Sequence, residues 1–254
     1  MKLEVYGKTD PGRVRKNNED NLLVDEELGL FIVADGMGGH SAGEVASKMA
    51  VDVVRDTFRR FIVDGGSAKI VGKVNPKFNE RTNQLASCVR LSNQFIYESA
   101  RSKPQHQGMG TTIDCFFVHK NKVSISHIGD SRIYLVRDGK LSQVTDDHSL
   151  VADQVRQGIL KQDEAEKSHL KNILTRALGV DENVEVDMTE LDARDKDMLI
   201  ACTDGLNKMV SDEEILKTVF AMKTPKMITE HLIDLANAAG GVDNTTVICA
   251  QVHK

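Results

Sequence analysis

The sequence feature that most constrains the fold is an apolar strand that ends in an acid and then in glycines. Residues 30–34 are the uninterrupted run Leu-Phe-Ile-Val-Ala, which leads directly into Asp35 and Gly-Met-Gly-Gly. Such a run predicts a strand buried on both faces, and a carboxylate at its end needs a compensating partner. Gly36, Gly38 and Gly39 let the backbone pass close to whatever Asp35 holds. We therefore expect chemistry where this strand ends.

Taken alone, the motif is also typical of a strand-to-helix turn that needs glycine, but the same construction recurs. Strands predicted over 123–128 and 198–203 lead into aspartates, and another aspartate precedes the last predicted strand, 245–252. These further acids are Asp130, Asp204 and Asp243. Together with Asp35 these make four carboxylates, which at one edge of a β core would repel one another and take up protons unless divalent cations neutralised them. Oxygen ligands without a histidine or cysteine pattern favour Mg²⁺ or Mn²⁺ over zinc or copper.

Composition argues against several other classes of protein. With 40% hydrophobic and 28% charged residues, the chain is typical of a globular protein, and we expect one domain over residues 1–254. A net charge of −5, no tryptophan and three tyrosines argue against a nucleic-acid-binding surface. No apolar run is long enough for a membrane span or a signal peptide. Four separated cysteines without a Cys-x-x-Cys pair predict reduced thiols. We expect a cytoplasmic monomer.

Periodicity predicts a mixed fold of helices and antiparallel strands. One long amphipathic helix begins at Ser41, with Glu44 completing a capping box, and a second covers 79–102; the two are expected to pair antiparallel. Residues 111–145 are predicted to form one antiparallel meander, since no segment between the strands is long enough for a helical crossover. Residues 146–179 are polar and irregular, with two short helices. They form either a flap-like insertion over the site or a surface excursion.

A loop of mixed charge over residues 13–20 immediately precedes a predicted strand. A charge run of this kind is usually a solvated surface loop. Here, however, we expect the loop to join two strands of the sheet region that carries Asp35. Arg15, Glu19 and Asp20 can then lie close to that carboxylate.

Six motifs follow one another along nearly the whole chain. They are Arg15 with Asn18-Glu19-Asp20, Asp35-Gly36-Met37-Gly38-Gly39-His40, Gly108-Met109-Gly110-Thr111-Thr112, Gly129-Asp130-Ser131-Arg132, Asp204-Gly205 and Asp243-Asn244-Thr245-Thr246-Val247. In this order they resemble the bacterial branch of the metal-dependent protein serine/threonine phosphatases, the protein phosphatase 2C type. The resemblance implies an α+β fold, a four-layer α-β-β-α sandwich of two antiparallel sheets flanked by antiparallel helix pairs.

The resemblance also implies which residues would hold metal ions. Asp35 would bridge two tightly bound Mn²⁺ or Mg²⁺ ions, and the carbonyl of Gly36 would bind one of them. Asp204 and Asp243 would bind the other. Asp130 would hold a weaker third ion together with Asp204.

Other residues would surround the metals or act on the substrate. Glu19, Asp20 and Asn244 would lie around the ions, and the first two would hold metal-bound waters. Arg15 would grip the phosphate. In animal members of the family the proposed general acid is a histidine directly after the Asp-Gly, a position held by methionine here. His40 follows three residues later, so both acid catalysis and hydrogen bonding around the metals stay open for it.

The resemblance further implies hydrolysis of phosphoserine and phosphothreonine on proteins, opposing a bacterial serine/threonine kinase and acting on its targets. Two divalent ions can activate a water and stabilise the in-line displacement, so no serine or cysteine nucleophile is required. A sandwich of this shape used only for binding would be expected to lose metal acids, and a two-metal nuclease would show a basic surface. A regulatory phosphatase dedicated to one phosphoprotein antagonist shares the chemistry and stays open.

Overall fold

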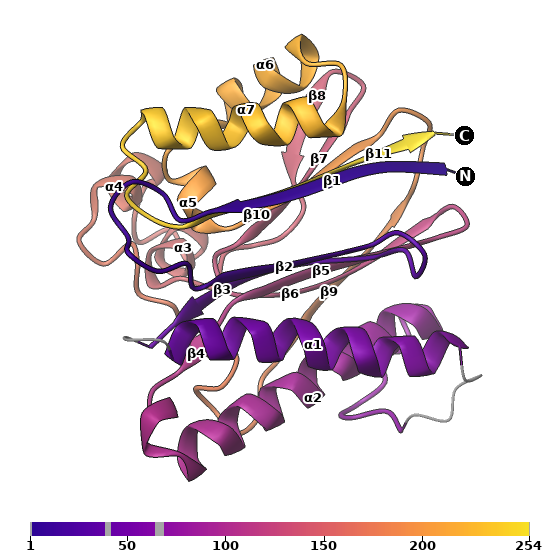
Figure 1. Ribbon diagram of the computed structural model, residues 1–254, viewed down its shortest axis with the longest axis vertical. Helices are drawn as coiled ribbons and strands as arrows, with labels where there is room; N and C mark the ends of the chain where they lie inside the picture. Colours follow the sequence, from indigo (N-terminus) through magenta and orange to yellow (C-terminus); the bar gives the residue numbers. More distant parts are fainter. Residues whose placement is uncertain (1, 39–41, 64–68, 254) are drawn as a thin grey trace.

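The structure, a computed structural model, describes residues 2–38, 42–63 and 69–253. Within these ranges two antiparallel β-sheets lie face to face, and helices cover the outer face of each sheet (Figure 1). The layers therefore run helix, sheet, sheet, helix. This arrangement confirms the four-layer α-β-β-α sandwich expected from the motifs.

Each sheet combines strands that are distant in the sequence. In spatial order, the first sheet contains β1 (Lys2–Asp10), β11 (Thr245–His253), β10 (Met198–Cys202), β7 (Arg132–Arg137) and β8 (Lys140–Gln143). The second contains β2 (Asp20–Asp25), β3 (Leu30–Met37), β5 (Ile113–His119), β6 (Lys122–Ile128) and β9 (Asp187–Asp192), with β4 (Gly110–Thr111) paired to β3. Because β1 pairs antiparallel with β11 along its whole length, both termini lie at one end of the sandwich (Figure 1).

Helices shield the outer faces of the two sheets. The long ones are α1 (Ala42–Val63) and α2 (Glu80–Ser102) against the second sheet, and α6 (Asp212–Ala221) and α7 (Pro225–Ala238) beside the first. The short ones are η1 (Pro104–His106), α3 (Leu150–Arg156), α4 (Gln162–Lys167) and α5 (Asp204–Asn207). Asn79 caps α2 by accepting the backbone N–H of Thr82 at 3.0 Å, whereas the predicted capping box at Ser41 lies outside the described residues. No helix in the described ranges is both long and apolar enough to span a bilayer.

The apolar run that opened the sequence analysis is a central strand buried on both faces, as predicted. In β3, Leu30, Ile32 and Ala34 pack into the cluster formed with α1 and α2. Phe31 and Val33 point the other way, into the cluster between the two sheets. All five side chains are fully buried. The alternation of a strand therefore explains why no polar residue interrupts this segment.

Two expectations about connectivity are wrong. Residues 111–145 do not form one meander, because β5 and β6 pair in the second sheet while β7 and β8 belong to the first. The chain changes sheets at residues 129–131, where Gly129 has a φ of 116° that favours glycine. The loop before β2 likewise joins β1 of the first sheet to the second sheet, not two strands of one sheet. Short crossovers leave the apolar alternation unbroken, so periodicity alone does not reveal them.

The stacked rings at the sheet interface give a test of this core. Phe31 and Phe116 stack with ring centroids 4.8 Å apart, and both are fully buried. Phe116→Ala should lower the free energy of unfolding by about 3–5 kcal/mol, because the substitution leaves a cavity between two packed sheets. Phe95→Ala is the matched control, since that ring is 49% exposed, and should cost less than about 1 kcal/mol. Urea unfolding measures both; equal losses would contradict the packing described here.

Candidate active site

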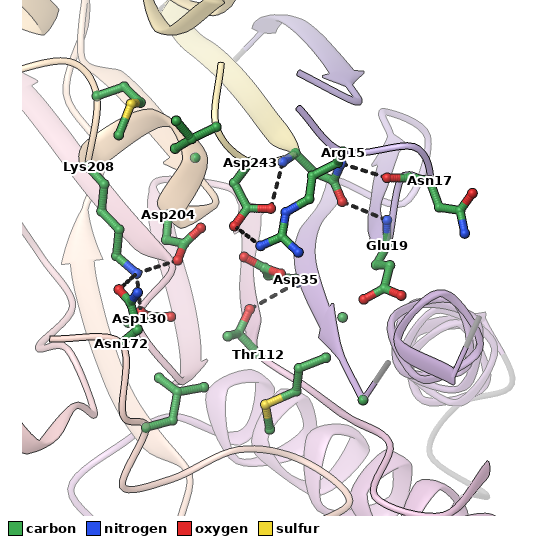
Figure 2. Close-up of a pocket in the computed structure, with 18 of the residues that line it drawn as sticks. Arg15, Asn17, Glu19, Asp35, Thr112, Asp130, Asn172, Asp204, Lys208 and Asp243 are labelled. Atoms are coloured by element: carbon green, nitrogen blue, oxygen red, sulfur yellow. Dashed lines mark hydrogen bonds and ion pairs between the residues drawn. The ribbon is translucent and has the colours of Figure 1, made fainter. Parts of the chain in front are cut away.

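One pocket (Figure 2) lies where β3 ends and β11 begins, which is the end of the sandwich opposite the chain termini (Figure 1). All four predicted strand-end acids line it: Asp35, Asp130, Asp204 and Asp243. Four further predicted residues line the same pocket: Arg15, Glu19, Gly36 and Asn244. The two sheet crossovers described above both contribute to its wall, so the acids of the first and second sheets face each other across it.

Asp35 is fixed by backbone contacts on its strand. Its N–H donates to Oγ1 of Thr112 at 3.0 Å, and its carbonyl accepts from the Thr112 N–H at 2.9 Å. A side chain at Gly36 would overlap the carbonyl of Gly43 and approach the carbonyl of Glu19 to 2.6 Å. Glycine here therefore lets β3, α1 and the loop before β2 meet behind the carboxylate.

Asp204 and Asp243 are brought together by a second close backbone approach. Asp204 is the first residue of α5, directly after β10, and Asp243 precedes β11, the neighbouring strand. A side chain at Gly205 would overlap the carbonyl of Asn244. The Asp-Gly pair therefore allows the start of α5 to rest against the start of β11.

Asn244 holds the charged loop in place. Its Oδ1 accepts the backbone N–H of Glu19 at 2.8 Å, and its Nδ2 donates to the carbonyls of Pro11 and Asn17 at 3.0 and 2.9 Å. The loop so positioned carries Arg15, whose guanidinium donates to Oδ2 of Asp243 at 2.7 Å. The Arg15 side chain is 55% exposed, so it stands at the rim of the pocket with freedom to turn.

Asp20 lies behind the pocket, paired in register with Asp35 across β2 and β3. Its Oδ2 accepts from the hydroxyls of Thr203 and Thr246 at 2.8 and 2.6 Å. Its Oδ1 is buried and has no hydrogen-bond partner among the described residues. An acceptor left open in this position is a place where a water bound at the pocket would be received.

Sequence reasoning missed several residues of the pocket. Lys208 contacts both Asp130 and Asp204 and lies four residues after Asp204, a helical spacing that was available in the sequence but only meaningful once α5 was known. Asn172 enters from the irregular 146–179 segment and could not have been placed from periodicity. Of the predicted site residues, His40 lies outside the described part of the chain.

Burial and the charges of neighbouring acids raise the pKa values of Asp20, Asp35 and Asp130. Burial first, then the charges of Asp20, Asp204 and others, holds the pKa of Asp35 well above its ordinary value. Burial raises the pKa of Asp20 to about 7 despite its two threonine donors. Burial and the charge of Asp204 raise that of Asp130 to about 6, although Lys208 works in the opposite direction. The protein alone therefore does not fully neutralise this pocket.

The donor set suits a hard divalent cation. Carboxylates and a backbone carbonyl are the ligands that Mg²⁺ and Mn²⁺ take, and the unpartnered buried oxygen of Asp20 can accept a further polar contact. Among the described residues, no three acidic, histidine or cysteine side chains are already gathered as a cluster. The residues present fit a metal site.

Comparison with known proteins agrees with this description. A profile of the family described as protein phosphatase 2C matches residues 13–236. The serine/threonine phosphatase stp of Listeria monocytogenes is 37% identical over 247 residues, which are 96% of this chain and 94% of that protein. Protein phosphatase PhpP of Streptococcus pneumoniae is 35% identical over 255 residues, or 99% of this chain and 98% of that one.

Solved structures share the whole fold. The crystal structure of the Mycobacterium tuberculosis serine/threonine phosphatase PstP/Ppp superposes with a TM-score of 0.87 at 33% identity, covering 100% of both chains. A structure described as the catalytic domain of PstP in complex with 2 manganese ions gives a TM-score of 0.83 at 34% identity, over 99% of both chains.

A four-layer sandwich with an oxygen-lined acidic pocket at one end and an arginine at its rim defines a metal-dependent phosphatase. The chain belongs to the protein phosphatase 2C family, the serine/threonine phosphatases that its six motifs resembled. The expected reaction class, phosphoprotein substrates and dependence on Mn²⁺ or Mg²⁺ are confirmed at the level of the family.

The raised pKa of Asp20 predicts a pH dependence of stability. Because its folded pKa of about 7 lies above the ordinary 3.8, the fold binds this proton more tightly than the unfolded chain does. The stabilisation is complete below about pH 4 and is lost as the pH rises through about 7. In chelator, Asp20→Asn should flatten this decline by on the order of 2–4 kcal/mol.

Urea unfolding of the metal-free protein between pH 4 and 8 measures the effect of Asp20→Asn. Asp56→Asn is the control, because that side chain is 58% exposed on α1 and should leave the slope unchanged. A free energy of unfolding that falls with pH equally in wild type and Asp20→Asn would show that Asp20 is not the group responsible.

Proposed function

We propose that this chain hydrolyses phosphoserine and phosphothreonine on proteins with two divalent ions bound in the described pocket. Asp35 and the carbonyl of Gly36 are the proposed ligands from the second sheet. Asp204 and Asp243 are the proposed ligands from the first sheet. The observation that carries the proposal is that carboxylates from both sheets, separate in the sequence, line one pocket beneath an arginine. The solved structure described as a complex with 2 manganese ions supports the choice of metal.

The bound ions would supply positive charge and a water of lowered pKa for attack on phosphorus. In the reaction an oxygen–phosphorus bond forms from that water, and the bond from phosphorus to the serine or threonine oxygen breaks. The departing oxygen takes a proton. His40 is the candidate donor, with hydrogen bonding around the metals as the alternative role.

Arg15 is the proposed phosphate ligand. Its guanidinium now pairs with Asp243, which together with hydrogen bonding raises the pKa of Arg15, so it remains charged. A guanidinium can donate two parallel hydrogen bonds to phosphate oxygens. Because the side chain is half exposed and faces the pocket (Figure 2), it can turn from Asp243 to an entering phosphate without unfolding the loop.

The roles around the metals also follow from placement. Glu19 lines the pocket beside Gly36, and Asp20 offers its open oxygen from behind, so both are proposed to hold metal-bound waters. Asn244 lines the pocket and also holds the loop before β2, and we assign it to positioning Glu19. The segment 146–179 contributes Lys171, Asn172 and Leu174 to the wall, which supports its expected role as a flap.

We further propose that the substrates include a bacterial serine/threonine kinase and its targets, since such a phosphatase has substrates only where a kinase has acted. A cytoplasmic location is supported by four cysteines that are all free and buried. A single domain is supported by the first sheet, which contains strands from both ends of the chain, and we propose that this domain acts as a monomer.

A phosphate-release assay on phosphoserine, phosphothreonine and phosphotyrosine peptides tests the proposal. Release should require Mn²⁺ or Mg²⁺, stop with chelator and favour the first two peptides. Asp35→Asn should fold and lose more than about tenfold in turnover, a change in barrier of about 1.4 kcal/mol. Glu213→Gln, on the surface of α6, is the control. Undiminished turnover by Asp35→Asn would reject the metal assignment.

Two substitutions test the Arg15 assignment: one removes the positive charge, and the other keeps the charge but removes the planar guanidinium. Arg15→Ala and Arg15→Lys should both lower kcat/KM on a phosphothreonine peptide by about ten- to a hundredfold, because an ammonium cannot replace charged bidentate bonds worth roughly 1.5–3 kcal/mol. Arg13→Ala is the matched control: it lies in the same loop but does not line the pocket, and should stay within about threefold. Similar losses at both positions would indicate diffuse electrostatic attraction instead.

A further inference from the structure

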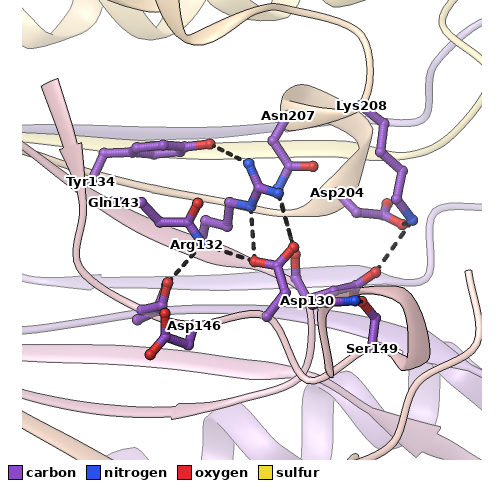
Figure 3. A network of polar contacts seen from close by, with 12 residues as sticks. Asp130, Arg132, Tyr134, Gln143, Asp146, Ser149, Asp204, Asn207 and Lys208 are labelled. Atoms are coloured by element: carbon purple, nitrogen blue, oxygen red, sulfur yellow. Dashed lines mark hydrogen bonds and ion pairs between the residues drawn. The ribbon is translucent and has the colours of Figure 1, made fainter. Parts of the chain in front are cut away.

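One interaction in the pocket runs against the expectation of a third metal. The resemblance assigns a weak third ion to Asp130 and Asp204, and that place is held by the side chain of Lys208 (Figures 2 and 3). Its Nζ donates to Oδ2 of Asp130 at 3.2 Å and also contacts Oδ2 of Asp204. The positive charge expected from a bound ion is therefore already present on the chain.

The lysine is held there by three acceptors. Besides the two carboxylates, Nζ donates to Oδ1 of Asn172 at 3.0 Å. An ammonium group has three N–H donors, so all three are satisfied in this position. The Lys208 side chain is only 26% exposed, in contrast to Arg15 at 55%. The Arg15 guanidinium pairs with a single carboxylate, whereas the Lys208 ammonium contacts three acceptors.

The backbone delivers the lysine to this position. Lys208 follows directly after α5, and its N–H donates to the carbonyl of Asp204 at 3.0 Å. Residues four apart on a helical turn face the same side, so Asp204 and Lys208 reach the pocket together. Asn207 lies within 3.4 Å of the carbonyl of Asp130, which ties the same turn to the sheet crossover.

We infer that Lys208 is the resident cation of the Asp130–Asp204 pair, so that this chain binds two divalent ions tightly and excludes a third. This inference rests on the proposed function for the other two ions. A divalent cation placed between these carboxylates would lie close to the ammonium that already contacts both of them and would be repelled by it. Lys208 contacts one oxygen of Asp204, which leaves the other for the proposed pair. Lys208 is thus a positioning residue, and Asn172 couples it to the 146–179 segment.

The test counts bound ions directly. Purified full-length chain is titrated with Mn²⁺, and free Mn²⁺ is followed by its paramagnetic resonance signal. Wild type should bind two ions per chain. Lys208→Met, which keeps the length and removes the charge, should bind one more. Combining it with Asp130→Asn should return the count to two. Lys217→Met is the matched control, because Lys217 pairs with Glu213 at the same four-residue spacing on exposed α6.

The ion count also tests the inference in chains that keep Lys208. If Asp130→Asn alone leaves the ion count unchanged, the inference is supported. A wild-type chain that binds three ions and loses one with Asp130→Asn would overturn it, as would a folded Lys208→Met that still binds two. A phosphate-release assay distinguishes failure of the Lys208 inference from failure of the proposed function. Three ions with intact hydrolysis refute only the role of Lys208, whereas no tightly bound ion and no hydrolysis refute the proposed function and the inference together.

Discussion

The repulsion among carboxylates at one end of the sandwich is the constraint on which the rest of the site depends. Asp35, Asp130, Asp204 and Asp243 line a single pocket, and like charges that share a partly buried space destabilise their ionised forms. Two cationic side chains offset part of this repulsion: Arg15 pairs with Asp243, and Lys208 contacts Asp130 and Asp204. The negative charge that these two side chains leave unbalanced is suited to neutralisation by divalent ions.

Glycines determine whether such a pocket can exist at all. Carboxylates approach one another only if their backbones do, and at Gly36 and Gly205 there is no room for even a methyl group. The Asp-Gly pairs in the sequence thus encode two things at once, a ligand and the close approach that positions it. Their physical meaning is local, which is why they could be found without knowing the fold.

Much of the site was predictable for this reason, and the rest was not. The strand-end aspartates, the buried strand at residues 30–34 and the charged loop all carry signals within a few residues. The sheet crossover at 129–131 carries none, because it preserves the strand period on both sides. Lys208 is a similar case. Its spacing from Asp204 fits a helix, but α5 is too short to be predicted from sequence periodicity. Asn172 depends on tertiary packing of an irregular segment.

The position of the acids relative to the two sheets has a mechanical consequence. Asp35 belongs to one sheet, whereas Asp204 and Asp243 stand at the ends of strands in the other. Between the sheets lie apolar side chains, whose contacts resist separation but have little directional preference against sliding. Any ion held jointly by these acids, or any phosphate bound through such ions, would link the two sheets directly at this end. Binding in the pocket is therefore coupled to the relative position of the two sheets. A force that slides one sheet past the other would be resisted at the catalytic end.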